Sequence, residues 1–129
     1  MKKTILLLFV GLMALSLKAQ DKTAKIEFKA ETIDYGKVER GSDGVRTFEF
    51  TNTGNAPLVI SNVKSSCGCT IPKKPDAPIA PGKTGKIEVK YDTKRPAGPF
   101  RKAITVTSNA ADTPTMVIKI KGELVEEAK

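Results

Sequence analysis

Apolar and polar residues alternate in short runs along most of this 129-residue chain. Alternation with a period of two is typical of a β-strand that buries one face and exposes the other to water. The clearest run is 86–91, and the run 46–51 places Phe48 and Phe50 on the same face. No long stretch after residue 19 has clean helical spacing, so the pattern predicts an all-β protein.

Strands of this kind recur at roughly regular intervals, with turn-forming residues between them. They are expected at residues 25–29, 34–38, 46–51, 58–64, 86–91, 101–108 and 115–122. About seven such strands predict an immunoglobulin-like antiparallel β-sandwich. Phe28, Phe48, Phe50 and Ile104 are expected in the core between the two sheets.

The connections are predicted from glycine, proline and asparagine. The segment Asn52-Thr53-Gly54-Asn55 is expected to reverse the chain, because its residues tolerate positive φ. Residues 72–81 contain four prolines and are expected to form an extended loop that Ile79 anchors to the core. The charged tail 123–129 is expected to fray.

The first 19 residues have the pattern of a secretory signal peptide. Lys2 and Lys3 precede an apolar run at 5–17, and the small residue Ala19 follows. The run is shorter than the ~20 residues that a membrane-spanning helix needs. We therefore expect cleavage after Ala19, which would leave a single soluble domain at residues 20–129, with its folded core at about 25–122.

Export bears on the location and on the charge of the protein. No cysteine lies near the expected cleavage site, so lipid attachment through an N-terminal cysteine is not expected. The mature protein is expected in the periplasm or outside the cell. Loss of Lys2, Lys3 and Lys18 lowers the formal net charge from +8 to +5, a modest excess that favours solubility.

The composition argues against most enzymatic chemistry. The chain has no histidine, so it cannot build a Ser-His-Asp or Cys-His arrangement. It also shows no glycine-rich phosphate loop and no metal-ligand cluster with the usual spacing. We therefore expect a protein that is not an enzyme and that carries no cofactor.

The two cysteines are the most conspicuous candidate site. Cys67 and Cys69 are separated by Gly68, and Ser66 and Thr70 flank them. Residues two apart have Cα atoms roughly 5–7 Å apart, which a disulfide tolerates. Gly68 would supply the unusual backbone angles of so small a ring. A ring of about three residues stabilises a fold by only ~1.6 kcal/mol in the chain-entropy estimate.

Three roles for the pair stay open. The first is a disulfide that shapes one loop, and the second is a strained, reducible redox pair. The third is a Cu(I) site, because thiolates suit this soft ion. Zinc is disfavoured, since it usually takes four ligands and the chain offers two thiols.

Basic residues are frequent in the second half of the chain. They are Lys73, Lys74, Lys83, Lys86, Lys90, Lys94, Arg95, Arg101 and Lys102. Solvated outer strand faces, with lysines guarding the sheet edges, account for most of them. Weak binding to an anionic envelope polysaccharide is the alternative. Nucleic acid is not expected, because the region has few aromatic residues for base stacking.

Several motifs in order resemble a known bacterial pattern. They are Asp34-Tyr35-Gly36, residues 48–54, Pro57-Leu58-Val59-Ile60, Cys67-Gly68-Cys69-Thr70, Ile79-Ala80-Pro81-Gly82 and Ser108-Asn109-Ala110. Over residues 25–122 the chain resembles the exported family catalogued as domain of unknown function 1573. More distantly, it resembles the ASPM/SPD-2/Hydin and major sperm protein sandwiches. The resemblance implies an Ig-like fold and secretion across the inner membrane, and it supplies no catalytic residues.

We therefore expect an exported binding or structural module of the cell envelope that acts through exposed strand edges and loops. Its partner is expected to be a protein or an envelope polymer. The alternative from a different class is a thiol redox or Cu(I)-handling protein that acts through Cys67 and Cys69.

Export predicts a processed N-terminus. N-terminal sequencing of the protein recovered from the exported fraction should begin at Gln20, because Ala19 is the expected cleavage residue. Recovery of an intact Met1 would contradict the signal peptide.

Overall fold

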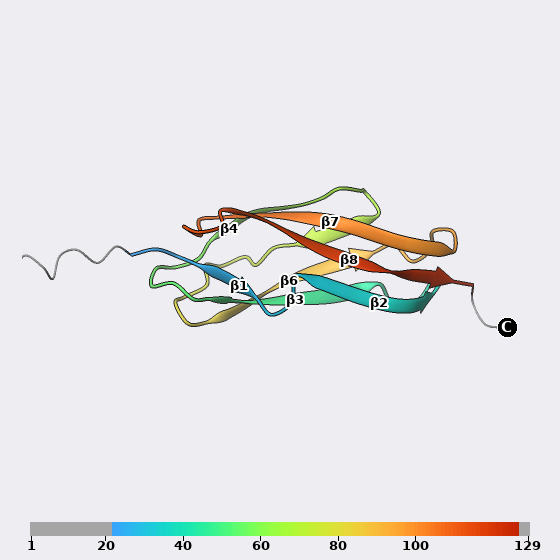
Figure 1. Ribbon diagram of the computed structural model, residues 1–129, viewed down its shortest axis with the longest axis horizontal. Helices are drawn as coiled ribbons and strands as arrows, with labels where there is room; N and C mark the ends of the chain where they lie inside the picture. The colour runs from blue at the N-terminus through green and yellow to red at the C-terminus, as the bar shows by residue number, and fades with distance from the viewer. Residues whose placement is uncertain (1–21, 127–129) are drawn as a thin grey trace, which may run out of the picture.

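The computed structural model describes residues 22–126, in which all the regular structure is β-strand. The strands are β1 (Ile26–Phe28), β2 (Thr32–Glu39), β3 (Val45–Asn52), β4 (Ile60–Ser65), β5 (Thr70–Lys73), β6 (Thr84–Tyr91), β7 (Gly98–Ser108) and β8 (Thr115–Val125). Figure 1 shows them in two layers along a shared long axis. The predicted signal peptide lies outside the described residues.

Each layer is a four-stranded sheet. The first sheet has the order β1-β3-β6-β5, and the second has the order β2-β8-β7-β4. The predicted all-β sandwich is confirmed. The expectation of purely antiparallel sheets is wrong at one pair, because β2 runs parallel to β8. Only three residues separate β1 from β2, so the chain keeps its direction as it passes from the first sheet to the second.

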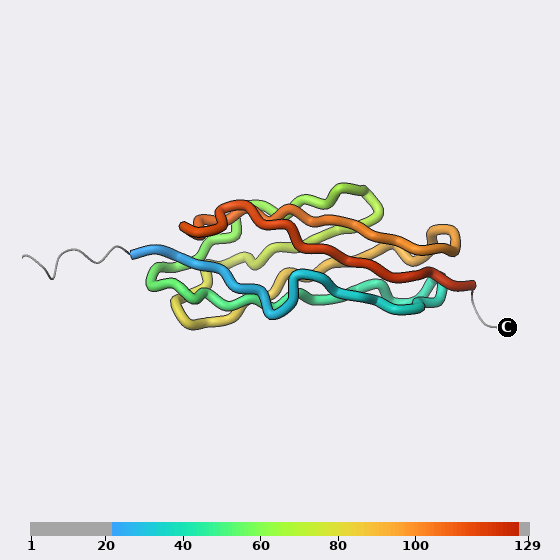
Figure 2. The backbone as a smooth tube through the Cα atoms, viewed as in Figure 1, coloured from blue at the N-terminus to red at the C-terminus, as the bar shows by residue number. Residues whose placement is uncertain are grey.

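The strands differ from the expected ones in several places. The additional strand is β5, which overlaps the proline-rich segment predicted as a loop. As an edge strand, β5 tolerates Pro72. The fourth strand begins at Ile60, and Leu58 instead forms an isolated bridge with Ile79. Residues 123–125 do not fray, because β8 continues through them beside the end of β2 and runs almost the full length of the sandwich (Figure 2).

The core lies between the sheets, at the positions that the alternation predicts. Phe48 and Phe50 are each 1% exposed, and Ile104 is fully buried. The ring of Phe28 packs edge-on against that of Phe48, with centroids 6.4 Å apart. These predicted core residues are confirmed, and Ile79 also packs against the cluster as expected.

Asn52, at the end of β3, is a buried polar residue that joins four parts of the chain. Its side-chain Nδ2 donates to the carbonyls of Ala56 at 2.7 Å and Ile79 at 2.9 Å. Its Oδ1 accepts from the N–H of Gly54 at 2.9 Å and, more weakly, from that of Lys25 at 3.4 Å. Since a buried amide is costly unless its hydrogen bonds are satisfied, this set fixes the two loops against β1.

The 52–55 segment turns for a different reason than expected. None of its residues has a positive φ. Gly54 is needed instead for close approach, because a Cβ there would lie 2.2 Å from the Thr23 carbonyl oxygen and 2.6 Å from Lys25 N. The predicted reversal is present, but its basis in positive φ is wrong.

Replacing Asn52 with alanine should cost about 3 kcal/mol of unfolding free energy, because buried partners in the loops lose their hydrogen bonds. Urea unfolding measures this. The control Asn62→Ala, at an exposed position of β4, should change the free energy by less than about 0.5 kcal/mol. Equal effects of the two substitutions would contradict the role of Asn52.

Candidate functional site

The Cys67-Gly68-Cys69 loop connects the two sheets at one pair of their edges. It follows β4 of the second sheet and leads directly into β5 of the first. A disulfide joins the two cysteines in the structure, with Cα atoms 5.3 Å apart. Cys67 N–H donates to Ser65 Oγ at 3.2 Å, and Thr70 N–H donates to the Cys67 carbonyl at 3.3 Å. The loop is therefore a tight turn between two edge strands.

The two cysteines differ in burial. Cys69 is 7% exposed and belongs to the core, whereas Cys67 packs against the core and is only partly buried. Gly68 is exposed, lacks a positive φ, and would meet nothing with an added Cβ. Neither the backbone conformation nor the space around residue 68 therefore requires a glycine there. The oxidation state of the pair in the exported protein stays a prediction.

The flanking residues Ser66 and Thr70 are held by the fold. Ser66 N–H donates to the Ala103 carbonyl at 3.0 Å, and Ser66 Oγ accepts from the Ala103 N–H at 3.3 Å. Thr70 is 3% exposed, and its Oγ1 lies 3.7 Å from Cys69 Sγ. Both residues thus anchor the ends of the loop to the sheets.

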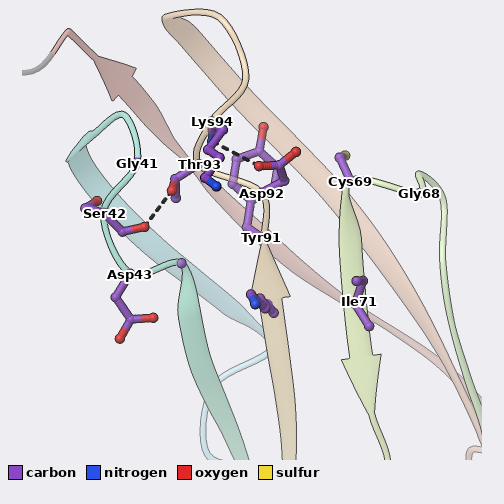
Figure 3. Close-up of a pocket in the computed structure, with 12 residues that line it drawn as sticks. Gly41, Ser42, Asp43, Gly68, Cys69, Ile71, Tyr91, Asp92, Thr93 and Lys94 are labelled. Atoms are coloured by element: carbon purple, nitrogen blue, oxygen red, sulfur yellow. Dashed lines mark hydrogen bonds between the residues drawn. The ribbon is translucent and has the colours of Figure 1, made fainter.

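A pocket of about 530 Å³ lies beside this loop, at one end of the sandwich. Three segments line it: the β2–β3 turn at 41–44, the loop and start of β5 at 68–71, and the end of β6 with its following residues at 90–94. Figure 3 shows Ser42 and Thr93 facing each other, with Cys69 and Ile71 across the opening. Thr93 Oγ1 donates to the Ser42 carbonyl, which joins two walls of the pocket.

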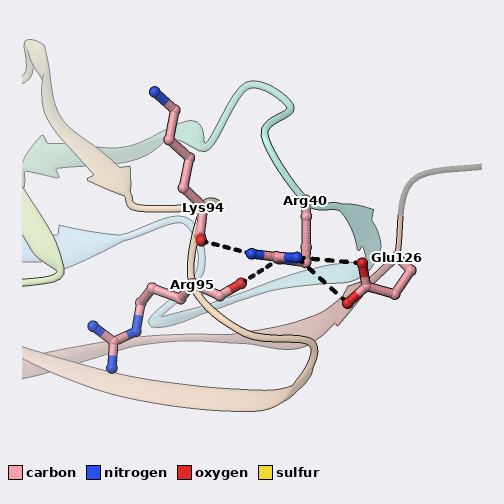
Figure 4. Close-up of polar contacts among 4 residues, drawn as sticks. All are labelled: Arg40, Lys94, Arg95 and Glu126. Carbon is pink, nitrogen blue, oxygen red and sulfur yellow. Dashed lines mark hydrogen bonds and ion pairs between the residues drawn. The ribbon is translucent and has the colours of Figure 1, made fainter.

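Arg40 fixes the same end of the molecule (Figure 4). Its guanidinium donates to the carbonyls of Arg95 at 2.8 Å and Lys94 at 3.1 Å. It also forms an ion pair with Glu126 at 3.3 Å. The end of β2 is thereby joined to the β6–β7 loop and to the residue after β8.

An aromatic cluster closes the core beneath the pocket. The ring of Tyr91 stacks on that of Phe100, with centroids 4.0 Å apart, and Tyr35 packs edge-on against both. Tyr35 donates its hydroxyl to the Gly44 carbonyl at 2.8 Å, while the Arg46 guanidinium lies over its ring. Burial raises the pKa of Tyr35 to about 12, although Arg46 opposes this shift. The hydroxyl is therefore a protonated structural donor near neutral pH.

The carboxylates in the pocket wall are used to shape turns. Asp43 Oδ1 accepts from the N–H of Val45, and Asp92 Oδ1 accepts from that of Lys94, each at 3.0 Å. A hydrogen bond from the N–H of a residue to the side chain of an aspartate two positions earlier is typical of an Asx turn. Among residues 22–126, no group of three or more Cys, Asp or Glu side chains is placed to hold a metal ion. Within the same residues, no helix has the length and apolar character to cross a membrane.

The basic residues singled out in the sequence do not form one surface. Lys86 and Lys90 are exposed on β6 of the first sheet, whereas Arg101 is exposed on β7 of the second. The structure instead brings Arg101 together with Lys119 and Lys121 of β8, which line one small pocket with Thr32. The sequence analysis missed this group, because only strand register reveals it.

The two packed sheets form an all-β sandwich whose fold resembles PapD-like, immunoglobulin-like domains. The fold is similar to a protein of unknown function from Porphyromonas gingivalis W83, with a TM-score of 0.72 and 21% identity over 83% of this chain and 50% of that one. It is also similar to PapD-like domain 7 of human CEP192, with a TM-score of 0.66 and 12% identity over 85% and 92%. The periplasmic chaperone SfaE matches with a TM-score of 0.54 and 15% identity over 80% and 58%.

The chain belongs to the family described as protein of unknown function (DUF1573), whose model matches residues 26–124. The family resemblance seen in the sequence is thereby confirmed. The chain spans half the length of the Porphyromonas gingivalis protein, and the low identities of the solved structures show the fold alone. A comparison with curated proteins finds no match.

Replacing both cysteines with alanine should cost only about 1–2 kcal/mol of unfolding free energy, because so small a ring restricts the unfolded chain little. Urea unfolding of the variant and of the wild type measures this. Mass spectrometry should show that reductant adds two hydrogen atoms to wild-type protein taken from the exported fraction. Thiols that alkylate there without reductant would contradict the disulfide.

Proposed function

We propose that this chain is an exported, non-enzymatic module of the bacterial cell envelope that binds an extended segment of a partner protein along the edge of β4. Strand addition to a sheet edge is a common mode of peptide recognition, in which backbone hydrogen bonds supply affinity and side chains supply specificity. The observation that carries the proposal is that backbone N–H and C=O groups of β4 point away from its neighbour β7.

On the side of β4 that has no neighbouring strand, alternate N–H and C=O groups point outward. Ser66 N–H donates to the Ala103 carbonyl, and Lys64 lies opposite Thr105 in the same register. In antiparallel strands the residues that bond to the neighbour alternate with those that do not. Val63 and Ser65 therefore direct their N–H and C=O groups away from β7. They form a ready template for one more strand.

The other three edges are protected. β5 presents no outward donor at its start, because Thr70 N–H is bonded to the Cys67 carbonyl and Pro72 has no N–H. β1 is only three residues long, and the pairing of β2 with β8 is interrupted between Asp34 and Lys37. Short, interrupted or proline-containing edges discourage strand addition. Among the four terminal strands of the two sheets, the regular run 62–66 at β4 is the best edge for a partner.

The side chains of β4 indicate the chemistry of the partner segment. Val63 is half-buried on the face toward the core, whereas Lys64 is exposed on the outer face. An added strand would place alternate residues next to these two side chains, since its side chains also alternate between faces. A segment that alternates apolar and acidic residues fits this edge.

The thiol redox alternative has less support. Exchange requires an attacking thiolate to reach a sulfur atom; Cys69 is 7% exposed, so the partly buried Cys67 offers the more accessible sulfur. The Cys67-Gly68-Cys69 loop instead lies between the available edge at β4 and the blocked edge at β5. Its proposed role is to keep these edges apart and in place.

An eight-residue peptide of alternating valine and glutamate should bind the protein and slow the hydrogen exchange of the Val63 and Ser65 amides. Val63→Pro should weaken binding by about tenfold or more, because it removes an outward donor and leaves the bonds from β4 to β7 in place. The control Val63→Thr keeps the donor and should bind like the wild type. Fluorescence polarisation gives the affinities, and NMR gives the exchange rates.

A peptide with lysine in place of glutamate should bind more weakly, since Lys64 would then face a like charge. Protection at the β2 edge with no change at Val63 and Ser65 would overturn the proposed site. Unchanged affinity of the Val63→Pro variant would do the same.

A further inference from the structure

The outer face of the second sheet carries a cluster of cations that the proposed strand addition does not use. Arg101, Lys119 and Lys121 line a pocket of about 200 Å³ together with the hydroxyl-bearing Thr32. Arg101 and Lys119 are exposed, and Lys121 is partly buried. Every charged side chain that lines this pocket is positive.

The strand register places like charges directly opposite each other. Arg101 of β7 pairs with Lys121 of β8. The first sheet differs, because Glu49 pairs with Lys86 and Lys73 pairs with Glu88 on its outer face. Like charges directly opposite on neighbouring strands are destabilising, and opposite charges are favourable. The Arg101–Lys121 pair is therefore a local cost to stability that the first sheet avoids.

Arg101, Lys119 and Lys121 form no ion pair with a carboxylate among the described residues. Within residues 22–126 the only ion pair joins Arg40 to Glu126, at the end of the sandwich. Asp34 lies opposite Lys121 across β2 and β8, but its Oδ1 accepts from the N–H of Gly36 at 2.8 Å. One oxygen of this carboxylate is therefore used by its own backbone, and the Asp34 side chain lies beside the cluster without forming an ion pair with Lys121.

A second depression extends the surface beyond the cluster. It has a volume of about 620 Å³, it shares Arg101 and Lys121 with the first pocket, and it is also lined by Lys37 and by the carboxylates of Asp34 and Glu123. The two hollows together form a groove that passes over the irregular part of β2. A linear ligand could therefore place one anionic group at the cluster and continue along the groove, where the carboxylates of Asp34 and Glu123 can accept hydrogen bonds from its hydroxyl groups.

We propose that Arg101, Lys119 and Lys121 form a binding site for the phosphate or carboxylate groups of a linear anionic polysaccharide. Arg101 supplies a planar donor fork that suits either oxyanion, and the two lysines add point charges beside it. Nucleic acid fits less well, because Phe100 is the one aromatic residue lining the two hollows and it is 8% exposed. Base stacking therefore has no open ring there.

Isothermal titration calorimetry at low salt tests the site with two probes, trigalacturonate for carboxylate and inorganic tripolyphosphate for phosphate. The variant Arg101→Gln/Lys121→Gln should weaken binding of the preferred probe by about tenfold or more. The control Lys86→Gln/Lys90→Gln removes the same charge from the first sheet and should change affinity by less than about twofold. Arg101→Lys should fall between wild type and the double variant, since it keeps the charge and loses the fork.

Thermal unfolding provides a second readout that shows whether the variant is folded. The Arg101→Gln/Lys121→Gln variant should be at least as stable as the wild type, because it removes the like-charge pair. Its weaker binding then cannot be attributed to unfolding.

Equal loss of binding in the two double variants would overturn the site, because net charge alone would explain it. Absence of binding to both probes would also overturn it. An oligothymidine that competes as well as the preferred probe at equal charge would overturn the assignment to a polysaccharide. The Val63→Pro variant should bind both probes normally, which separates this site from strand addition at β4.

Discussion

The buried side chain of Asn52 is the polar interaction on which one end of this sandwich depends. Its amide bonds to carbonyls in two different loops and to a backbone N–H in the turn after β3. A partly satisfied buried amide would be worse than an apolar residue, so these loops must reach it together. The Asn52 backbone also bonds to residues 82 and 83. One residue thus fixes the ends of β1, β3 and β6 in a part of the core that apolar contacts alone would leave less defined.

The opposite end is held by polar contacts of a different kind. Arg40 donates to two carbonyls of the β6–β7 loop, and Tyr35 donates to the Gly44 carbonyl from within the aromatic cluster. These contacts shape the pocket wall independently of the disulfide. The Cys67–Cys69 ring is therefore a local constraint on the turn between β4 and β5, where the chain passes from the second sheet to the first.

Much of the fold could be predicted because it follows from local alternation. Phe48 and Phe50 lie on one face of β3 in any antiparallel pairing, so their burial was readable in the sequence. The parallel pairing of β2 with β8 was not readable, because it depends on how the chain passes between sheets after β1. β5 was missed because Pro72 argues against a central strand. An edge strand tolerates proline, but the sequence does not show which strands lie at the edges.

The candidate binding surfaces were harder to predict than the fold for a related reason. Lys119 and Lys121 look in the sequence like any exposed positions of an amphipathic strand. Only the register of β7 against β8 shows that Lys121 faces Arg101. Similarly, the run 62–66 resembles other half-buried strands until the sheet order makes it an edge.

Two features of the second sheet are costly if the domain has no partner. An unprotected edge invites unwanted pairing, and a pair of like charges directly opposite on neighbouring strands destabilises the sheet. The first sheet shows that this fold can avoid both, since β5 carries Pro72 at its edge and Glu49 faces Lys86 on its outer surface. The cost is therefore confined to one sheet and is not a property of the sandwich as a whole. Proteins commonly accept local instability where a surface binds a ligand. Both proposed binding surfaces thus lie on the second sheet, where these local costs are found.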